Sequence, residues 1–398
     1  MSADTPRIGQ RIRLARKGRG MSLETLAGLV GRSKGWMSMV ETGRLPLDRR
    51  SDIAAIADAL DVSATDLLEE PEPVVPIARP RRTDRPDVIR LREMLLDTTL
   101  DDPPDVPERP EADLLEEMRG PIAQARAAAD YHTLARRLPS LIGELHVAAM
   151  RSETMLRPLT EACIAATFTL RHVGHSDLAW IAADRAGQAA SRLGDPVLVG
   201  AAAFARAHGR PAASRSRPLR NAARTADAIE PHLSDERFEY EVYGMLHLTG
   251  ALAAQVDRDT ATATAHADEA ASVAARLGEH DGAWQSFGPA NVGSWRVMLS
   301  VEAGAPEDAL RHAADIDSTA LPSQGRRAAL AIEVGRAHAM LGHTREAVTS
   351  LRRAERLSPS RLYANSLACE LVTDLMGRAQ RQAGGRDLRG LAWRMGII

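Results

Sequence analysis

Small residues recur in a fixed phase from about residue 112 to the end of this 398-residue chain. The clearest copy spans Ala328 to Arg361. Its spacing predicts two antiparallel helices in close contact, because small side chains let helices approach and proline ends the second helix. The residues that set this spacing are Gly335, Gly342, Ala347, Leu351, Ala354 and Pro359. A fold that repeats this unit buries its core between successive helices and needs no sheet.

The same phase recurs four more times. The marker residues are Gly174, Ala179, Ala183 and Ala186; Ala207, Leu219, Ala223, Ala226 and Pro231; Arg258, Ala263 and Ala270; and Gly304, Ala309 and Ala313. An alanine-rich bundle could mimic one or two copies, but not readily five. Aromatic residues make up only 3% of the chain, which suits packed helices better than a β-sandwich. The pattern resembles the tetratricopeptide repeat, and this resemblance implies a right-handed solenoid with a concave binding groove.

Residues 7 to 68 have a different pattern, a series of short amphipathic segments. Helices are expected near residues 8–17, 23–30, 33–42, 48–60 and 63–68. Ser22 and Ser33 are placed as N-caps of the second and third helices, and Gly31 lies in the turn between them. Met37 and Val40 are expected to face inward. The layout predicts a small five-helix domain whose helix-turn-helix binds double-stranded DNA.

The charge distribution supports this interpretation. Residues 1 to 50 hold eleven Lys or Arg and four acids, whereas residues 51 to 70 hold six acids and no base. The formal charge of −2 for the whole chain therefore hides a basic N-terminal region. Attraction to phosphates of this kind supplies most sequence-independent affinity for DNA. A basic surface that serves only solubility is the alternative if charge is considered without the helical pattern.

The N-terminal region resembles the Xre/Cro-repressor family of helix-turn-helix proteins. The matching residues are Ile8-Gly9, Arg16, Gly20-Met21-Ser22, Leu26-Ala27, Gly31, Ser33, Ser38, Glu41, Gly43-Arg44, Ile56-Ala57 and Ala59-Leu60. The resemblance implies a structural ion pair between Arg16 and Glu41. Leu23 stands where the family often has Gln, so that family contact with DNA does not carry over.

The outward face of the third helix is the predicted reading surface. Lys34 and Ser38 could donate to base edges, and Trp36 and Met39 could touch a thymine methyl group. The full predicted set for DNA is Ser33, Lys34, Gly35, Trp36, Ser38, Met39, Arg44, Arg49 and Arg50, the three arginines as phosphate contacts. Two alternatives remain open: Trp36 packs against the loop 44–50, and a glycine at position 35 only avoids a clash.

Nine prolines between residues 71 and 110 predict a linker, because proline cannot continue a helix. The predicted domains are therefore a DNA-binding domain at residues 1–70, a Pro-rich linker at 71–111 and the repeat domain at 112–398. A short amphipathic helix is expected within the linker, near residues 86–96. That helix could dock on either domain or on a second chain.

The segment 284–296 is unusual within the alanine-rich repeats, because it contains two of the five Trp and a polar Asn. Asn offers a donor and an acceptor together, which suits a peptide backbone. Trp284, Asn291 and Arg296 are therefore candidate ligand-binding residues. The alternative is that Asn291 satisfies a backbone group and both Trp belong to the core.

Other chemistries find no support in the sequence. It contains no P-loop, no dinucleotide-binding glycine motif, no HExxH and no nucleophile placed with a base. We therefore expect no enzyme, no catalytic residue, no cofactor and no metal site. Cys163 and Cys369 are expected to be small core residues in a reducing cytoplasm. The N-terminus has no secretory signal pattern, and no long apolar stretch predicts a membrane span.

The chain also resembles a group of actinobacterial Xre regulators with tetratricopeptide-like C-terminal halves. The segments that carry this resemblance are 172–186, 287–292, 301–304 and 354–356. It implies a cytoplasmic transcriptional regulator. We expect a homodimer whose solenoid senses a peptide, small-molecule or protein effector. The alternative function is an interaction adaptor or antitoxin whose DNA-binding domain only regulates its own operon.

Overall fold

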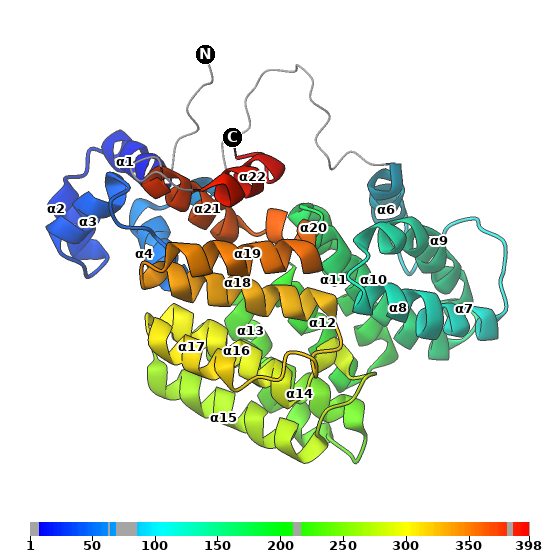
Figure 1. The fold of residues 1–398 in the computed structure, drawn as a ribbon. Helices are drawn as coiled ribbons and strands as arrows, with labels where there is room; N and C mark the ends of the chain where they lie inside the picture. The colour runs from blue at the N-terminus through cyan, green and yellow to red at the C-terminus, as the bar shows by residue number, and fades with distance from the viewer. Residues whose placement is uncertain (1–7, 63, 69–85, 210–215, 380–384, 398) are drawn as a thin grey trace.

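The computed structural model describes residues 8–62, 64–68, 86–209, 216–379 and 385–397. Within these ranges every element of regular structure is a helix. A small N-terminal domain, here called the head (residues 8–68), lies at one end of a long array of packed helices (Figure 1). The all-helical fold expected from the sequence is therefore confirmed.

The head consists of five short helices around one apolar core. Ile12, Leu26, Met37 and Ile56 are fully buried in this core. A Cβ atom at Gly9 would overlap the carbonyl oxygen of Val40, so glycine there lets α1 and α3 pack closely. Ser63, where the fifth helix is expected to begin, lies outside the described residues. The helices are α1 (Ile8–Gly18), α2 (Leu23–Leu29), α3 (Lys34–Glu41), α4 (Arg50–Leu60) and α5 (Ala64–Leu68).

The helix predicted within the Pro-rich linker is α6 (Pro86–Asp97), and it docks on the array. Val88, Leu91 and Leu95 are buried in the main core of the array, where α6 packs on α9 and α11. The sequence left open whether this helix docks on the head, on the array or on a second chain, and in the structure it docks on the array. The predicted linker residues 71–85 lie outside the described residues.

The array is a succession of helical hairpins, and five of them match the five sequence copies. They are α10/α11, α12/α13, α14/α15, α16/α17 and α18/α19. In the clearest copy, Gly342 adopts a φ of +78° between α18 and α19. A Cβ at Gly335 would come within 3.4 Å of the Ala347 carbonyl oxygen, so glycine permits the close approach. Pro359 begins the next helix, α20.

The bounds of the array helices follow the chain order. They are α7 (Glu111–Glu117), α8 (Ala123–Ala127), α9 (Tyr131–Ala149), α10 (Leu156–His172), α11 (Ser176–Leu193), α12 (Pro196–His208), α13 (Ser216–Ile229), α14 (Arg237–Val256), α15 (Thr260–Leu277), α16 (Pro289–Ala303), α17 (Pro306–Ala314), α18 (Gln324–Met340), α19 (Thr344–Leu357), α20 (Pro359–Tyr363), α21 (Ser366–Ala379) and α22 (Arg386–Arg394). A π-helical segment, Met118–Ile122, joins α7 to α8. Short 3-10 segments occur at Glu153–Met155, Glu230–His232 and Trp284–Ser286.

The chain returns to the head at its C-terminal end. Helices α18, α19, α21 and α22 lie near the head (Figure 1). Helix α4 also contacts α14, and α5 contacts α21. None of the described helices combines the length and apolar character required to span a membrane. Both cysteines are free thiols; Cys163 is buried as expected, whereas Cys369 is only partly buried.

Candidate nucleic-acid interface

The second and third helices of the head are joined as the sequence predicts. The Ser22 hydroxyl accepts a hydrogen bond from the Thr25 amide, and the Ser33 hydroxyl accepts one from the Trp36 amide. Gly31 has a φ of +67° in the turn between the two helices, a conformation that costs glycine little. Local chemistry therefore fixes where α3 begins and how it is presented.

The inner side of α3 is tied to α1 by an ion pair. Arg16 donates to both carboxylate oxygens of Glu41, with N–O distances of 2.5 and 2.9 Å. A third donor hydrogen on Arg16 reaches the Met21 carbonyl at 2.7 Å. The hydrogen bond with Glu41 raises the pKa of Arg16, which outweighs the effect of burial. The expected bridge is confirmed, and its position inside the head makes it architectural.

The outer side of α3 is open to solvent. Lys34, Gly35 and Met39 are exposed, and Ser38 is partly exposed. A Cβ at Gly35 would meet nothing closer than the Ser33 hydroxyl at 4.0 Å. The head itself therefore has no steric need for glycine there, which removes the clash alternative. Figure 1 shows α2 and α3 at the end of the molecule, away from the array.

Two side chains on this surface have partners within the head. The Lys34 ammonium lies 3.3 Å from the Glu24 carboxylate, and both groups are largely exposed. The Trp36 ring is partly buried against the head core, with the Arg32 guanidinium 5.1 Å from its centroid. Trp36 is thus both a packing residue and a partly exposed one. A carboxylate at position 24 places a negative charge beside the predicted reading surface.

Residues 7–70 match a family model described as a helix-turn-helix domain. The head is a helix-turn-helix domain. In DNA-binding regulators this fold presents its second helix to the major groove, and α3 occupies the corresponding position in the head. The match covers the head and none of the array. No curated protein matches the chain.

The three arginines predicted to hold phosphates differ in their surroundings. Arg44 is exposed. Arg49 is partly buried, forms an ion pair with Asp52 at 3.0 Å and packs against Gly304 of the array. Arg50 is buried and bonded to array residues, so the expectation of a phosphate contact there is corrected in this arrangement. Its charge is already satisfied inside the protein.

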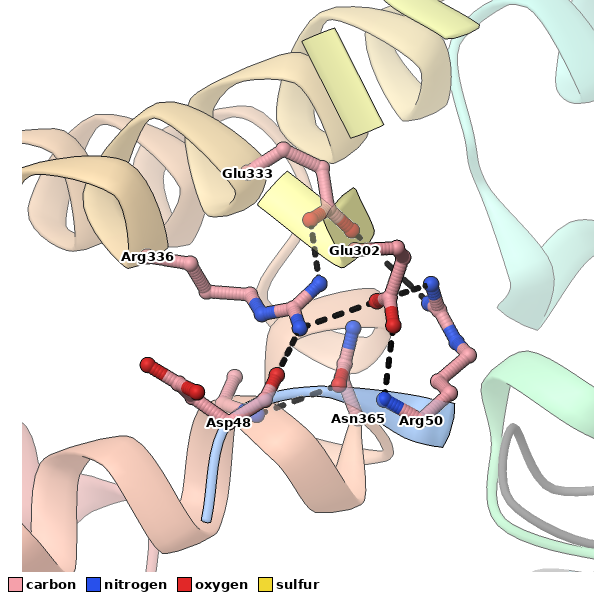
Figure 2. Close-up of polar contacts among 7 residues, drawn as sticks. Asp48, Arg50, Glu302, Glu333, Arg336 and Asn365 are labelled. Atoms are coloured by element: carbon pink, nitrogen blue, oxygen red, sulfur yellow. Dashed lines mark hydrogen bonds and ion pairs between the residues drawn. The ribbon is translucent and has the colours of Figure 1, made fainter. Parts of the chain in front are cut away.

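Arg50 belongs to a buried ion network between head and array, here called the joint (Figure 2). Arg50 donates to Glu302 through its backbone amide and its guanidinium, each at 2.6 Å. Arg336 donates to the same carboxylate at 2.9 Å and to Glu333 at 2.5 Å. It also donates to the Asp48 carbonyl oxygen. Two guanidinium groups therefore face two carboxylates across the boundary.

The charges of the joint stabilise one another. Burial alone would raise the pKa of Glu302, but the positive charges of Arg50 and Arg336 hold its pKa below the usual value. Removing one member of such a buried pair leaves an uncompensated charge, which is strongly destabilising. The joint therefore holds the head in one placement on the array.

Further contacts lie around the joint. Arg11 of α1 forms an ion pair with Glu370 of α21. Arg258, which follows α14, donates to Asp52 of α4 at 2.9 Å. Leu367 of the array is buried in the core of the head. The head thus shares apolar and ionic contacts with three separate parts of the array.

The joint was not predicted from the sequence, although the sequence contains a signal for it: three charged residues that stand among apolar neighbours. Glu302, Glu333 and Arg336 are charged residues on helix faces whose neighbours are Ala, Val and Ile. Buried charges in such positions are paired in folded proteins. The pairing with Arg50 could not be inferred, because it joins residues 252 positions apart.

The three candidate ligand residues do not share one site. Trp284 is buried and lines a hollow in the array. Asn291 is buried and does not line that hollow; its amide nitrogen donates to the Gln285 carbonyl at 3.2 Å. Arg296 does not line the hollow; it forms an ion pair with Asp268 of α15. The contact with the Gln285 carbonyl fits the alternative in which Asn291 satisfies a backbone group, while its side-chain oxygen is buried without a hydrogen-bond partner in the described structure.

Proposed function

We propose that this protein is a sequence-specific DNA-binding transcriptional regulator of the Xre type. The observation that carries the proposal is the exposed outer face of α3 in a helix-turn-helix domain. The Arg16–Glu41 bridge and the capped start of α3 support the assignment to this type. Lys34 and Ser38 read bases, while Arg44 binds phosphate. Trp36 and Met39 supply apolar contacts to the bases.

The array is the sensing and assembly half of this regulator. Its hairpins and their small contact residues support a tetratricopeptide-like solenoid of the actinobacterial regulator type. Two copies would place their heads on half-sites about 34–36 Å apart, or a multiple of that distance. An effector bound in the array would change the placement of the heads. The protein acts in the cytoplasm and catalyses no reaction.

Sequencing of DNA recovered with the protein in its native host is the first test. A recurring, roughly palindromic site is expected, and fragments without any shared sequence would contradict the proposal. Affinity for the recovered duplex is then measured against a scrambled duplex at one fixed salt concentration. An interaction adaptor would instead show a strong protein partner and little preference between the duplexes.

Replacing Lys34 and Trp36 with Ala tests the reading helix. The double variant should lose about 1–3 kcal/mol of preference for the recovered site per lost base contact. Arg345, an exposed residue on α19, provides the matched control as Arg345→Ala. Circular dichroism confirms that each variant is folded. Unchanged affinity in the double variant would show that α3 does not read the site.

A further inference from the structure

Two adjoining hollows lie in the array, with volumes of about 490 and 370 Å³. These volumes fall within the range of small-molecule sites. Helices α10, α12, α16 and α18 contribute to both hollows. The wall common to both contains Arg171, His172, His208, Trp295, Arg326 and Arg361.

Three arginines of this wall have no carboxylate partner among the described residues. Arg361 donates to His172 at 3.1 Å, and Arg326 makes only a long contact of 3.4 Å with the Gln285 side chain. The wall of the hollows thus gathers positive charge that the protein itself does not neutralise. Arg126 extends this charge along the larger hollow.

The surroundings of these arginines make their charge costly. Burial, followed by the charges of Arg361, Arg50 and Arg326, lowers the pKa of Arg171 to about 9. Burial and the charge of Arg361 likewise lower the pKa of Arg326 to about 9. Both groups remain protonated at neutral pH. His172 stays neutral, because burial and then the neighbouring arginines lower its pKa well below the usual value.

The larger hollow also concentrates aromatic rings. The chain has four Phe, four Tyr and five Trp, and six of these thirteen line this one space. The six are Tyr131, Phe168, Phe204, Phe238, Trp284 and Trp295. Phe204 and Trp284 meet edge to face with centroids 5.3 Å apart. A flat ring would find aromatic partners here.

A strained turn closes one side of the larger hollow. Gln285 and Ser286 have φ values of +53° and +57°, which are unusual for residues other than glycine. The Gln285 side-chain nitrogen is buried and has no hydrogen-bond partner within the described structure. Strain and an unsatisfied donor together indicate a group held ready for a ligand.

The acidic residues of the larger hollow are engaged elsewhere or exposed. Glu241 accepts from Arg237 at 2.8 Å and from the Trp284 amide at 2.7 Å. Glu161 lies 3.6 Å from Arg157, and Asp281 is exposed. These carboxylates therefore do not balance the wall of arginines.

We infer that the hollows bind a small molecule that combines a flat ring with at least two negative charges, carried as phosphate or carboxylate. The charged end contacts Arg171, Arg326 and Arg361, and the ring lies among Phe204, Trp284 and Trp295. This inference rests on the proposed function, because it names the chemical class of the effector. Arg50 and Glu333 line the smaller hollow, so the ligand site and the joint share a wall.

Calorimetry on the full-length protein tests the charge and ring requirements. The probes are 1-naphthyl phosphate, phthalate, inorganic phosphate and the neutral 1-naphthol. At least one of the two ring dianions should bind at least about tenfold more tightly than inorganic phosphate or 1-naphthol. The stronger ring dianion indicates whether phosphate or carboxylate is preferred. No binding of either ring dianion at millimolar concentration would overturn the inference, as would equal binding of 1-naphthol.

Two variants separate a ligand role from a structural role. Arg171→Gln and Arg326→Gln should each weaken the better probe at least about tenfold. Without ligand, each should melt at the wild-type temperature or about 2–4 °C above it, since mutual repulsion is relieved. Arg345→Gln is the control and should change neither quantity. A lower melting temperature in both variants, or unaltered probe binding, would contradict the inference.

Specific DNA binding is measured on the same wild-type sample. DNA binding without probe binding would overturn the ligand class and leave the regulator standing. Probe binding without any preference for the recovered DNA site would overturn the regulator and leave the ligand site standing. The two failures are therefore distinguishable.

Discussion

The joint and the wall of the hollows both contain clustered arginines, which are buried in the joint and partly buried in the wall, and the two clusters differ in whether carboxylates face them. In the joint, Arg50 and Arg336 face Glu302 and Glu333, and the two signs balance. In the wall, Arg171 and Arg326 have no carboxylate partner among the described residues, and they repel one another. In the balanced cluster each buried charge has an opposite charge beside it, so removing one partner is costly. In an unbalanced cluster the like charges repel one another and lower the free energy of unfolding, and a bound anion would relieve that repulsion.

The largest expected effect contrasts one arginine from each cluster. Arg336→Gln should lower the free energy of unfolding by about 3–5 kcal/mol, because Glu302 and Glu333 then share Arg50 as their one remaining cation and one buried negative charge is left uncompensated. Arg171→Gln should leave the free energy of unfolding unchanged or raise it slightly. Urea denaturation of both variants beside the wild type measures the difference. Equal destabilisation by the two substitutions would remove the distinction between the clusters.

Two glycines of the head show a similar contrast between a residue that the fold requires and one that it does not. Gly9 is required by the fold, since a Cβ there would overlap the backbone of α3. Gly35 has open space around it. Gly35→Ala should therefore stabilise the head by up to about 1 kcal/mol, because alanine is the better helix former.

The effect of Gly35→Ala on DNA affinity tests whether DNA, rather than the fold, requires glycine at this position. If the backbone of α3 approaches DNA closely at position 35, Gly35→Ala weakens specific binding although the protein is more stable. Anisotropy titrations on the recovered site measure this loss. An increase in stability with unchanged DNA affinity would show that DNA does not approach α3 at Gly35.

The carboxylate beside the reading helix gives a smaller effect of opposite sign. Glu24 is exposed, lies 3.3 Å from Lys34 and carries the same charge as DNA. Glu24→Gln should tighten DNA binding by about two- to fivefold and steepen its dependence on salt, because Lys34 gains a phosphate or base partner. Glu307→Gln, on an exposed site of α17, is the control and should leave both quantities unchanged. Weaker binding in Glu24→Gln would mean that Glu24 positions Lys34.

Local patterns predicted the parts of this molecule that short-range chemistry determines. Ser22, Ser33 and Gly31 fix the helix-turn-helix through contacts within a few residues. The repeated small residues likewise fix each hairpin, because their partners lie on the next helix. The Arg16–Glu41 bridge was also accessible, through the resemblance of the head to known repressors.

Local sequence patterns did not predict the joint or the hollows. Arg50 and Glu302 lie 252 residues apart, and nothing in their local sequence states that they meet. The sequence marks the segment 284–296 as unusual, and the structure places its three candidate residues apart from one another. Trp284 lines the larger hollow, while the charged residues of the shared wall come from α10, α18 and α20. A site assembled from several hairpins depends on how the array curves, and a local pattern does not contain that curvature.

The smallest expected effect concerns protonation of the wall. His172 has a pKa well below its usual value, because burial and then the nearby arginines disfavour a further positive charge. In the unfolded chain the same group takes up a proton near pH 6.5. The stability that neutral His172 contributes is therefore present above about pH 6.5 and is lost progressively as the pH falls below that value.

Comparison of His172→Gln with the wild type isolates this group from the other buried histidines. Urea midpoints at pH 7.5 and pH 5.5 should differ less in the variant than in the wild type. If Arg171→Gln is added to the wild-type background, the pH dependence should also weaken, because one of the repelling charges has gone. An identical loss of stability on acidification in all three proteins would show that the arginines of the wall do not act on His172. The electrostatic description of the hollows would then fail, whatever binds there.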